Sequence, residues 1–245
     1  TYAVHTPIGN SQARPDLLSK FQGIASTDPR HDSDAYAAIL ENLDQTVGSV
    51  LRFLDDSGLA SDTIVVFTSD NGGHIGPTDN DPLRFRKGSF YEGGLRVPLI
   101  VRWPGGGVPA GEQSGSLVHS VDFFPSFVEA AGLSMPGRNA AGDPVNYDGH
   151  SFLAHPPSPD TGEREREAIF YHFPGYLDER ARPCEVAVKR IDGTVYKLIY
   201  TYDPGYVGNS NPNGSGEDGS EGLDPLDDHW EFYNLGANLS ETRDL

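Results

Sequence analysis

The chain has 245 residues, 36% hydrophobic and 10% aromatic, a composition that excludes a disordered protein and allows a sizeable core. Acidic residues outnumber basic residues by 36 to 18, and the resulting net charge of −18 argues against nucleic acid as the main partner. No apolar run approaches the roughly 20 residues that span a membrane, and the single cysteine, Cys184, excludes an intrachain disulfide framework and a cysteine-based zinc site.

The first periodic signals predict two helices. A short helix is expected around Leu17–Phe21, and a long one follows, with Ser33 or Asp34 as its cap and Gly58 after its end. The apolar residues of the long helix recur at three- and four-residue intervals and form one stripe. They are Tyr36, Ile39, Leu40, Leu43, Val47, Val50, Leu51 and Leu54.

Strands and helices alternate in the next hundred residues. Thr63–Thr68 is a near-continuous apolar run, which predicts a strand buried on both faces. A glycine-rich loop over 72–94 leads to a second strand, Val97–Trp103, and a helix is predicted over Val118–Ala131. This alternation is typical of an α/β sheet.

After the Pro- and Gly-rich connector 133–166, the pattern changes to short strands joined by turns such as Asp192-Gly193. The predicted strands are Ala168–Phe173, Glu185–Arg190, Tyr196–Tyr202 and Glu231–Leu235. Residues 203–228 are rich in Gly, Ser, Asn, Pro and Asp and are expected to form a flexible loop. The sequence therefore predicts part of a main α/β domain in 1–165 and a small, mostly antiparallel α+β subdomain in 166–245.

The stretch TSDNGGHIG, which starts at Thr68, places Asp70 and Asn71 directly after a predicted strand. Ligands of open α/β sheets bind beyond the carboxyl ends of strands, although Asp-Asn-Gly is also a favourable turn sequence in any protein. If the stretch is a site, a carboxylate and an amide oxygen suit a hard cation, Ca²⁺ or Mg²⁺, whereas zinc would prefer His or Cys. The run Arg84-Phe85-Arg86-Lys87 is either a solvated loop or a local anion site in this acidic chain.

Together, the runs SDNGGH and NDPLRFRKGSFYEGGLRVPLIVRWPG resemble the type I sulfatases of the alkaline phosphatase superfamily. Further stretches agree, in the order that the family has them: YAVHTP, SVDFFPSFVEAAGL, YDGHSF, YKLIY and WEFYNL. The resemblance covers nearly the whole chain. It implies an alkaline-phosphatase/sulfatase-like α/β fold, a sheet sandwiched by helices that is present in part, followed by a small C-terminal antiparallel sheet.

The resemblance also implies roles for individual residues. Asp70 and Asn71 would be two oxygen ligands of a divalent cation, calcium rather than magnesium. Lys87 would contact a sulfate oxygen, and His5 would face the sulfate and the ester oxygen. These roles make physical sense, because a cation and an ammonium offset the charge of a sulfate ester and an imidazolium can protonate the leaving oxygen.

Other residues of the motifs have less direct roles. His74 and Arg86 are expected to bind substrate, and Arg86 departs from the small residues usual in that element. Glu92 and Arg96 are expected to hold the loop together through a surface salt bridge of little energy. His172 could reach the edge of the pocket from the subdomain.

The family's nucleophile is a formylglycine made from the Cys or Ser of a C/S-x-P-x-R element. Cys184 has no proline two residues later and is expected to be an inert thiol, while the match of Ser134 to Arg138 falls in the connector and is interpreted as chance. The sequence therefore predicts the C-terminal half of a sulfatase, with the N-terminal half of the same enzyme as its partner and the source of the nucleophile.

The expected function is hydrolysis of a sulfated small molecule or glycan by a periplasmic or secreted enzyme, with no membrane span and no nucleic acid. Two alternatives remain open. One is a catalytically inactive module that binds sulfated glycans. The other is a phosphodiesterase or phosphonate hydrolase of the same superfamily.

Overall fold

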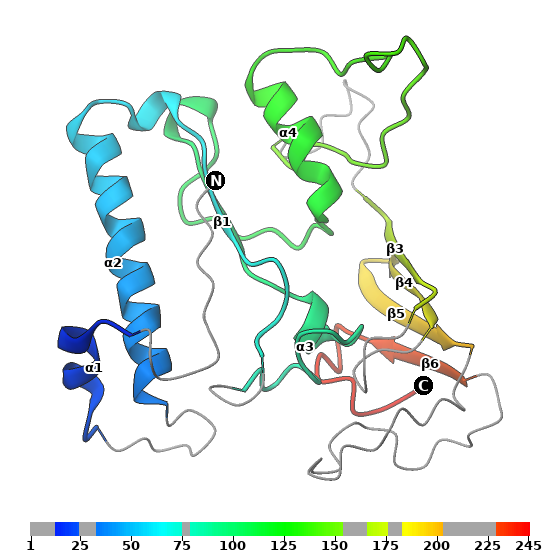
Figure 1. Ribbon diagram of the computed structural model, residues 1–245. Helices are drawn as coiled ribbons and strands as arrows, with labels where there is room; N and C mark the ends of the chain where they lie inside the picture. The colour runs from blue at the N-terminus through cyan, green and yellow to red at the C-terminus, as the bar shows by residue number, and fades with distance from the viewer. Residues whose placement is uncertain (1–12, 25–32, 75–78, 154–165, 176–182, 203–228) are drawn as a thin grey trace.

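The computed structural model describes residues 13–24, 33–74, 79–153, 166–175, 183–202 and 229–245. His5 and the predicted loop 203–228 lie outside these ranges. The described chain is mixed α/β, as predicted, with a two-stranded and a four-stranded sheet (Figure 1). None of the described helices is long and apolar enough to cross a membrane.

Both predicted N-terminal helices are present. Helix α1 (Pro15–Phe21) packs against α2 (Asp34–Asp56). Ser33 caps α2, because its hydroxyl accepts a hydrogen bond from the backbone N–H of Tyr36 at 3.3 Å. The apolar stripe of α2 buries Ile39 and Leu54 but leaves Val50 52% exposed, so α2 is only partly covered by the described residues.

Strands β1 (Val65–Thr68) and β2 (Leu99–Arg102) form an antiparallel pair in which Val65 lies opposite Arg102. In Figure 1, α2 lies on one side of this pair and α4 (Phe123–Ala130) on the other. The expectation of a strand buried on both faces was wrong here, since all four residues of β1 are only half-buried. The reason is that, among the described residues, β1 pairs with β2 alone and both strands border a large hollow.

The structure places α4 later than the predicted start at Val118. A short 3-10 turn, η5 (Ser120–Asp122), precedes the helix, and His119 before it is extended. The buried carboxylate of Asp122 causes this start, because it accepts hydrogen bonds from the backbone N–H of His119 at 2.7 Å and of His150 at 2.8 Å. Asp122 also pairs with the guanidinium of Arg166.

The four predicted strands of the C-terminal sheet are confirmed to within two residues at each end. They are β3 (Ala168–Phe173), β4 (Cys184–Ile191), β5 (Thr194–Thr201) and β6 (His229–Asn234), all antiparallel and in sequence order. The Asp192-Gly193 turn joins β4 to β5 with φ angles of 48° and 81°, the left-handed values that a tight hairpin needs. The domain boundary near residue 165 stays a prediction.

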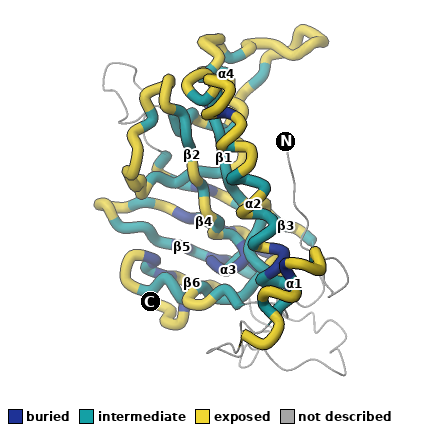
Figure 2. The backbone as a smooth tube through the Cα atoms, turned by 90° about the vertical axis from the view of Figure 1, so that its left-hand side faces the viewer, coloured by how far each residue is buried: buried dark blue, intermediate teal, exposed yellow. Residues whose placement is uncertain are grey.

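The described core lies on the inner face of this sheet. Its buried residues are Ile169, Cys184, Val186, Val188, Ile199, Tyr233 and Leu235. Phe90, Tyr91 and Leu117 pack against them from the main part of the chain. Figure 2 shows buried backbone where the sheet meets the one-turn helix α3 (Glu92–Leu95), which the sequence did not predict. The sheet is thus packed directly on the segment that follows Lys87.

Candidate functional site

The strand end that carries Asp70 and Asn71 is fixed by the glycines after it. The backbone N–H of Gly72 donates to the carbonyl of Gly94 at 2.9 Å. A Cβ on Gly72 would lie 1.7 Å from the carbonyl oxygen of Gly93, so no other residue fits without a backbone shift. The glycine therefore allows two backbone segments to touch, whereas the sequence suggested only a turn or a crowded site.

Lys87 is joined to the same loop. Its backbone N–H donates to the carbonyl of Gly73 at 2.9 Å. The side-chain amide of Asn80 links both segments, since Nδ2 donates to Gly73 O at 3.1 Å and to Phe85 O at 3.0 Å. The structure thus brings the Asp-Asn element and the Lys87 element together through backbone contacts. Sequence reasoning assigned no role to Asn80, although it is the first residue of the quoted run NDPLRFRK.

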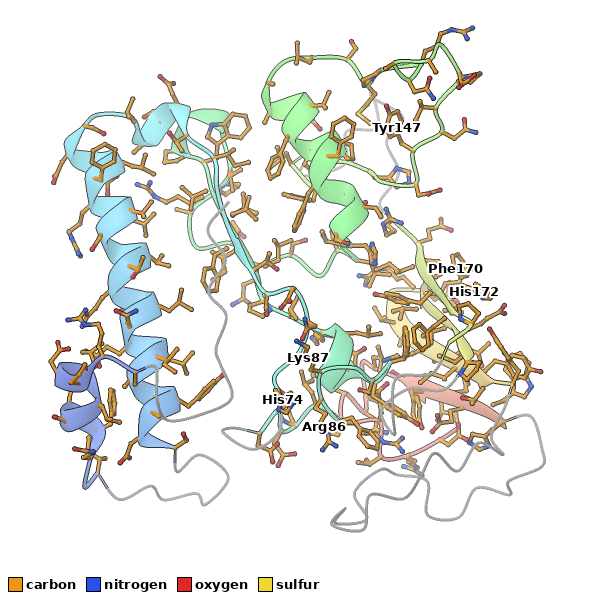
Figure 3. The ribbon with its side chains drawn as sticks, in the orientation of Figure 1. His74, Arg86, Lys87, Tyr147, Phe170 and His172 are labelled. Atoms are coloured by element: carbon orange, nitrogen blue, oxygen red, sulfur yellow. The ribbon has the colours of Figure 1, made fainter. Side chains whose placement is uncertain are left out.

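A hollow of about 3330 Å³ borders these elements and also α2, β1, β2 and α4. Asp70, Asn71, His74 and Lys87 line it, and Arg86 is not among its lining residues. Ligand pockets usually measure about 300–1,000 Å³, so this hollow is larger than a pocket for one small molecule. Figure 3 shows His74, Arg86 and Lys87 in the loop region between β1 and α3.

The exposure of the predicted site residues fits contact with a ligand. Asp70, His74 and Lys87 are exposed, while Asn71 and Arg86 are half-buried. Their individual roles stay predictions, and so does the role of His5, which lies outside the described residues.

Two of these residues, Asp70 and Asn71, would be ligands in a calcium site. The carboxylate of Asp70 and the amide of Asn71 have the oxygen chemistry that Ca²⁺ prefers, but the ion takes six to eight oxygens. Within the described ranges, no three His, Cys, Asp or Glu side chains come together as a metal cluster. The donors of this chain therefore fit calcium as part of a ligand set.

Glu92 makes the expected salt bridge with Arg96, but its carboxylate is buried and belongs to a larger ion cluster. Its carboxylate, 7% exposed, pairs with Lys197 Nζ at 3.0 Å and with Arg96 at 3.2 Å. Lys197 is fully buried and also pairs with the fully buried Glu241 at 2.8 Å. Glu241 closes the cluster by accepting the backbone N–H of Glu92 at 2.6 Å.

A second cluster surrounds Arg84. Its guanidinium donates to Tyr233 Oη at 2.8 Å and lies 4.0 Å from the centre of the Tyr91 ring. Tyr91 and Tyr233 both donate to the carboxylate of Glu231, at 2.6 and 2.5 Å. Burial raises the pKa of both tyrosines, and Glu231 raises it further, so both remain neutral donors at physiological pH.

The expectation that His172 reaches the pocket edge was wrong. His172 lies on the outer face of β3, where its Nδ1 is 3.3 Å from Glu185 Oε1, and it does not line the hollow. Figure 3 shows it well apart from Lys87. Strand alternation gives the reason, because Ile169 of the same strand points into the core and His172 is three positions later.

Cys184 has the environment of an inert thiol. It is buried in the core, and burial raises its pKa to about 12, with the carboxylate of Glu185 adding to the effect. A thiol that stays protonated is a poor nucleophile. Arg138 of the Ser134–Arg138 match donates locally to the carbonyl of Gly142 at 2.6 Å, and the interpretation of that match as chance stays a prediction.

Two family models match the sequence. One, described as Sulfatase, matches residues 1–133, and the other, N-sulphoglucosamine sulphohydrolase, C-terminal, matches residues 83–207. A sulfatase of Formosa agariphila is 38% identical over 253 residues, covering 100% of this chain and 40% of that protein. Steryl-sulfatase of Mus musculus is 36% identical over 216 residues, covering 80% of this chain and 32% of that protein.

Among solved structures, the crystal structure of Ps i-CgsB in complex with k-i-k-neocarrahexaose is similar to this chain. The TM-score is 0.64 at 25% identity, over 98% of this chain and 44% of that one. The chain thus spans less than half the length of each of these three relatives.

Proposed function

Because the chain belongs to the sulfatase family, we propose that the complete protein hydrolyses a sulfate ester. One observation supports this most directly. The backbone bond from Lys87 to Gly73 holds a lysine beside the Asp70-Asn71 element at one border of the hollow. An ammonium next to cation ligands suits a substrate group that spreads negative charge over three oxygens.

In this proposal the residues of the chain bind and orient the sulfate. Lys87 donates to a sulfate oxygen, while His74, which also lines the hollow, contacts the rest of the substrate. His5 protonates the oxygen of the leaving group, for which an imidazolium is suited. The nucleophile is a formylglycine outside this chain.

Calcium is the cofactor that we propose for Asp70 and Asn71. When bound, the ion would withdraw charge from the sulfate as a Lewis acid. Asp70 would supply a charged ligand and Asn71 a neutral one, and other parts of the protein would supply the rest.

For the substrate we propose a sulfated carbohydrate. The family model over residues 83–207 carries the name of a sulfohydrolase of an amino sugar, and the structural relative Ps i-CgsB was crystallised with k-i-k-neocarrahexaose. Steryl-sulfatase, a relative over 80% of the chain, gives the competing steroid class. A comparison of kcat/KM on sulfated sugars and on a steryl sulfate decides between them.

The variant Asp70→Ala of the complete protein tests the proposed site. Loss of an outer-shell partner commonly weakens metal binding 10- to 100-fold, so loss of a direct ligand should weaken calcium binding by at least about tenfold. Turnover of 4-nitrophenyl sulfate should fall with it. Asp55→Ala is the control, since Asp55 is an exposed carboxylate on α2. Unchanged calcium affinity and unchanged turnover in Asp70→Ala would remove the assignment.

A further inference from the structure

The segment that carries Lys87 is held in place from outside. Two backbone hydrogen bonds join it to the Asp70-Asn71 loop, one from Lys87 N–H to Gly73 O at 2.9 Å and one from Gly72 N–H to Gly94 O at 2.9 Å. The segment contains only one turn of helix, α3, of its own. Its side-chain anchors, Arg84 and Glu92, both reach the C-terminal sheet.

Lys197 is the centre of the anchor that holds Glu92. It lies on the inner face of β5, between two core positions of the same strand, and its side chain has no exposure to solvent. Lysine is almost never fully buried unless it is paired. Here it pairs with two carboxylates, Glu92 at 3.0 Å and Glu241 at 2.8 Å.

The charges of this cluster balance. Two carboxylates face two cations, because Arg96 pairs with the second oxygen of Glu92 at 3.2 Å. Removing Lys197 would leave the two buried carboxylates, Glu92 and Glu241, facing one cation, and breaking a buried pair in this way is strongly destabilising. The effect would reach the Lys87 segment directly, since Glu241 also accepts the backbone N–H of Glu92.

Lys197 cannot act on substrate itself. It is fully buried and is not among the residues that line the hollow, whereas Lys87 and Glu92 are. Any effect of Lys197 on a reaction in the hollow must therefore pass through the segment that it holds.

We propose that Lys197, with Glu241, is a positioning residue for Lys87, because it clamps Glu92 and so fixes the backbone of the 84–96 segment beside the Asp70-Asn71 element. This inference rests on the proposed function for the role of Lys87. The clamp itself is a property of the fold and is tested separately.

Hydrogen exchange of the complete protein tests the clamp without any substrate. In the Lys197→Met variant, the amides of Gly72, Lys87 and Gly93 should exchange at least about tenfold faster than in the wild type, because each of their backbone hydrogen bonds has its donor or its acceptor on the released segment. The amides of α2 should not change. Lys197→Arg, which keeps the charge, should restore part of the protection. Unchanged exchange at these three amides in a folded Lys197→Met protein would overturn the proposal.

Kinetics on 4-nitrophenyl sulfate test the link to Lys87. Misplacement of a binding group by about 1 Å can cost about 100-fold, so Lys197→Met should lower kcat/KM roughly 10- to 100-fold. If Lys197 acts through Lys87, the double variant with Lys87→Ala should be no worse than Lys87→Ala alone, within about twofold. Losses that multiply in the double variant would refute the link.

Lys189→Met is the matched control. Lys189 is exposed on the neighbouring strand β4, so its loss should leave exchange and activity unchanged. If Lys197→Met fails to fold, Glu241→Gln replaces it, since the amide keeps an oxygen for the Glu92 N–H but removes the charge that faces Lys197. If the wild type turns over no sulfate ester, the proposed function fails, and the exchange experiment still decides whether the clamp exists.

Discussion

The replacement of Gly72 by alanine tests whether the Asp70-Asn71 element depends on the contact between two backbone segments. The added Cβ would lie 1.7 Å from the carbonyl oxygen of Gly93 and 3.1 Å from Cα of Gly94. Both neighbours are backbone atoms of α3, which is packed under the C-terminal sheet, so no flexible side chain can move aside. We expect the strand end and α3 to separate.

The size of the effect follows from the geometry. Moving the Cβ from 1.7 Å to the 3.0 Å limit for real contacts takes 1.3 Å of backbone shift. Such overpacking costs about 1–3 kcal/mol, and loss of the bond from Gly72 N–H to Gly94 O costs about 1 kcal/mol. The free energy of unfolding should therefore fall by about 2–4 kcal/mol.

Urea titration of the complete protein, followed by circular dichroism, measures this change. Gly137→Ala is the control, because no atom lies within 4 Å of a Cβ at Gly137, and its effect should stay within about 0.5 kcal/mol. A Gly72→Ala protein as stable as this control would show that the segments separate at no cost, and the reasoning would be refuted.

Two further predictions concern buried polar groups. Asp122→Ala should cost about 3–5 kcal/mol of unfolding free energy, because it leaves Arg166, 13% exposed, without its carboxylate partner. Asp55→Ala, which breaks the more exposed pair with Arg102, should cost less than about 1 kcal/mol. Equal costs of the two variants would contradict this prediction. The thiol of Cys184 has its pKa raised from 9.0 to about 12, so the thiolate fraction at pH 8 falls by about 1,000-fold. Iodoacetamide should then label the native protein far more slowly than the urea-unfolded one, and equal labelling rates would disprove the burial argument.

Local patterns in the sequence predicted most of the elements. The stripe of α2 and the four strands of the C-terminal sheet depend on neighbours within a few residues, so periodicity was enough to find them. The late start of α4 was missed, because Asp122 is fixed by Arg166, 44 residues away. The sequence also did not predict that β1 is only half-buried, since an apolar run does not show how much protein packs against each face of the strand.

Only those residues of the candidate site that lie close together in the sequence were predicted. Motif resemblance found Asp70, Asn71 and Lys87, which stand near one another in the chain. The clamp joins residues 105 and 149 positions apart, and no local pattern reports such a contact. One signal was present. Lys197 alternates with Val195 and Ile199 on the apolar face of β5, and a lysine at such a position needs a buried partner.

The separation of the clamp residues along the chain has a consequence for synthesis. Glu92 is bonded to Glu241, which a ribosome adds 149 residues later. At 5–20 residues per second, Glu92 waits about 7–30 s for this partner. During that time the loop around Lys87 lacks its anchor and the apolar inner face of the sheet is incomplete. The anchor of the site therefore forms only after residue 241 has been added, and the interval before that is when a chaperone would matter most.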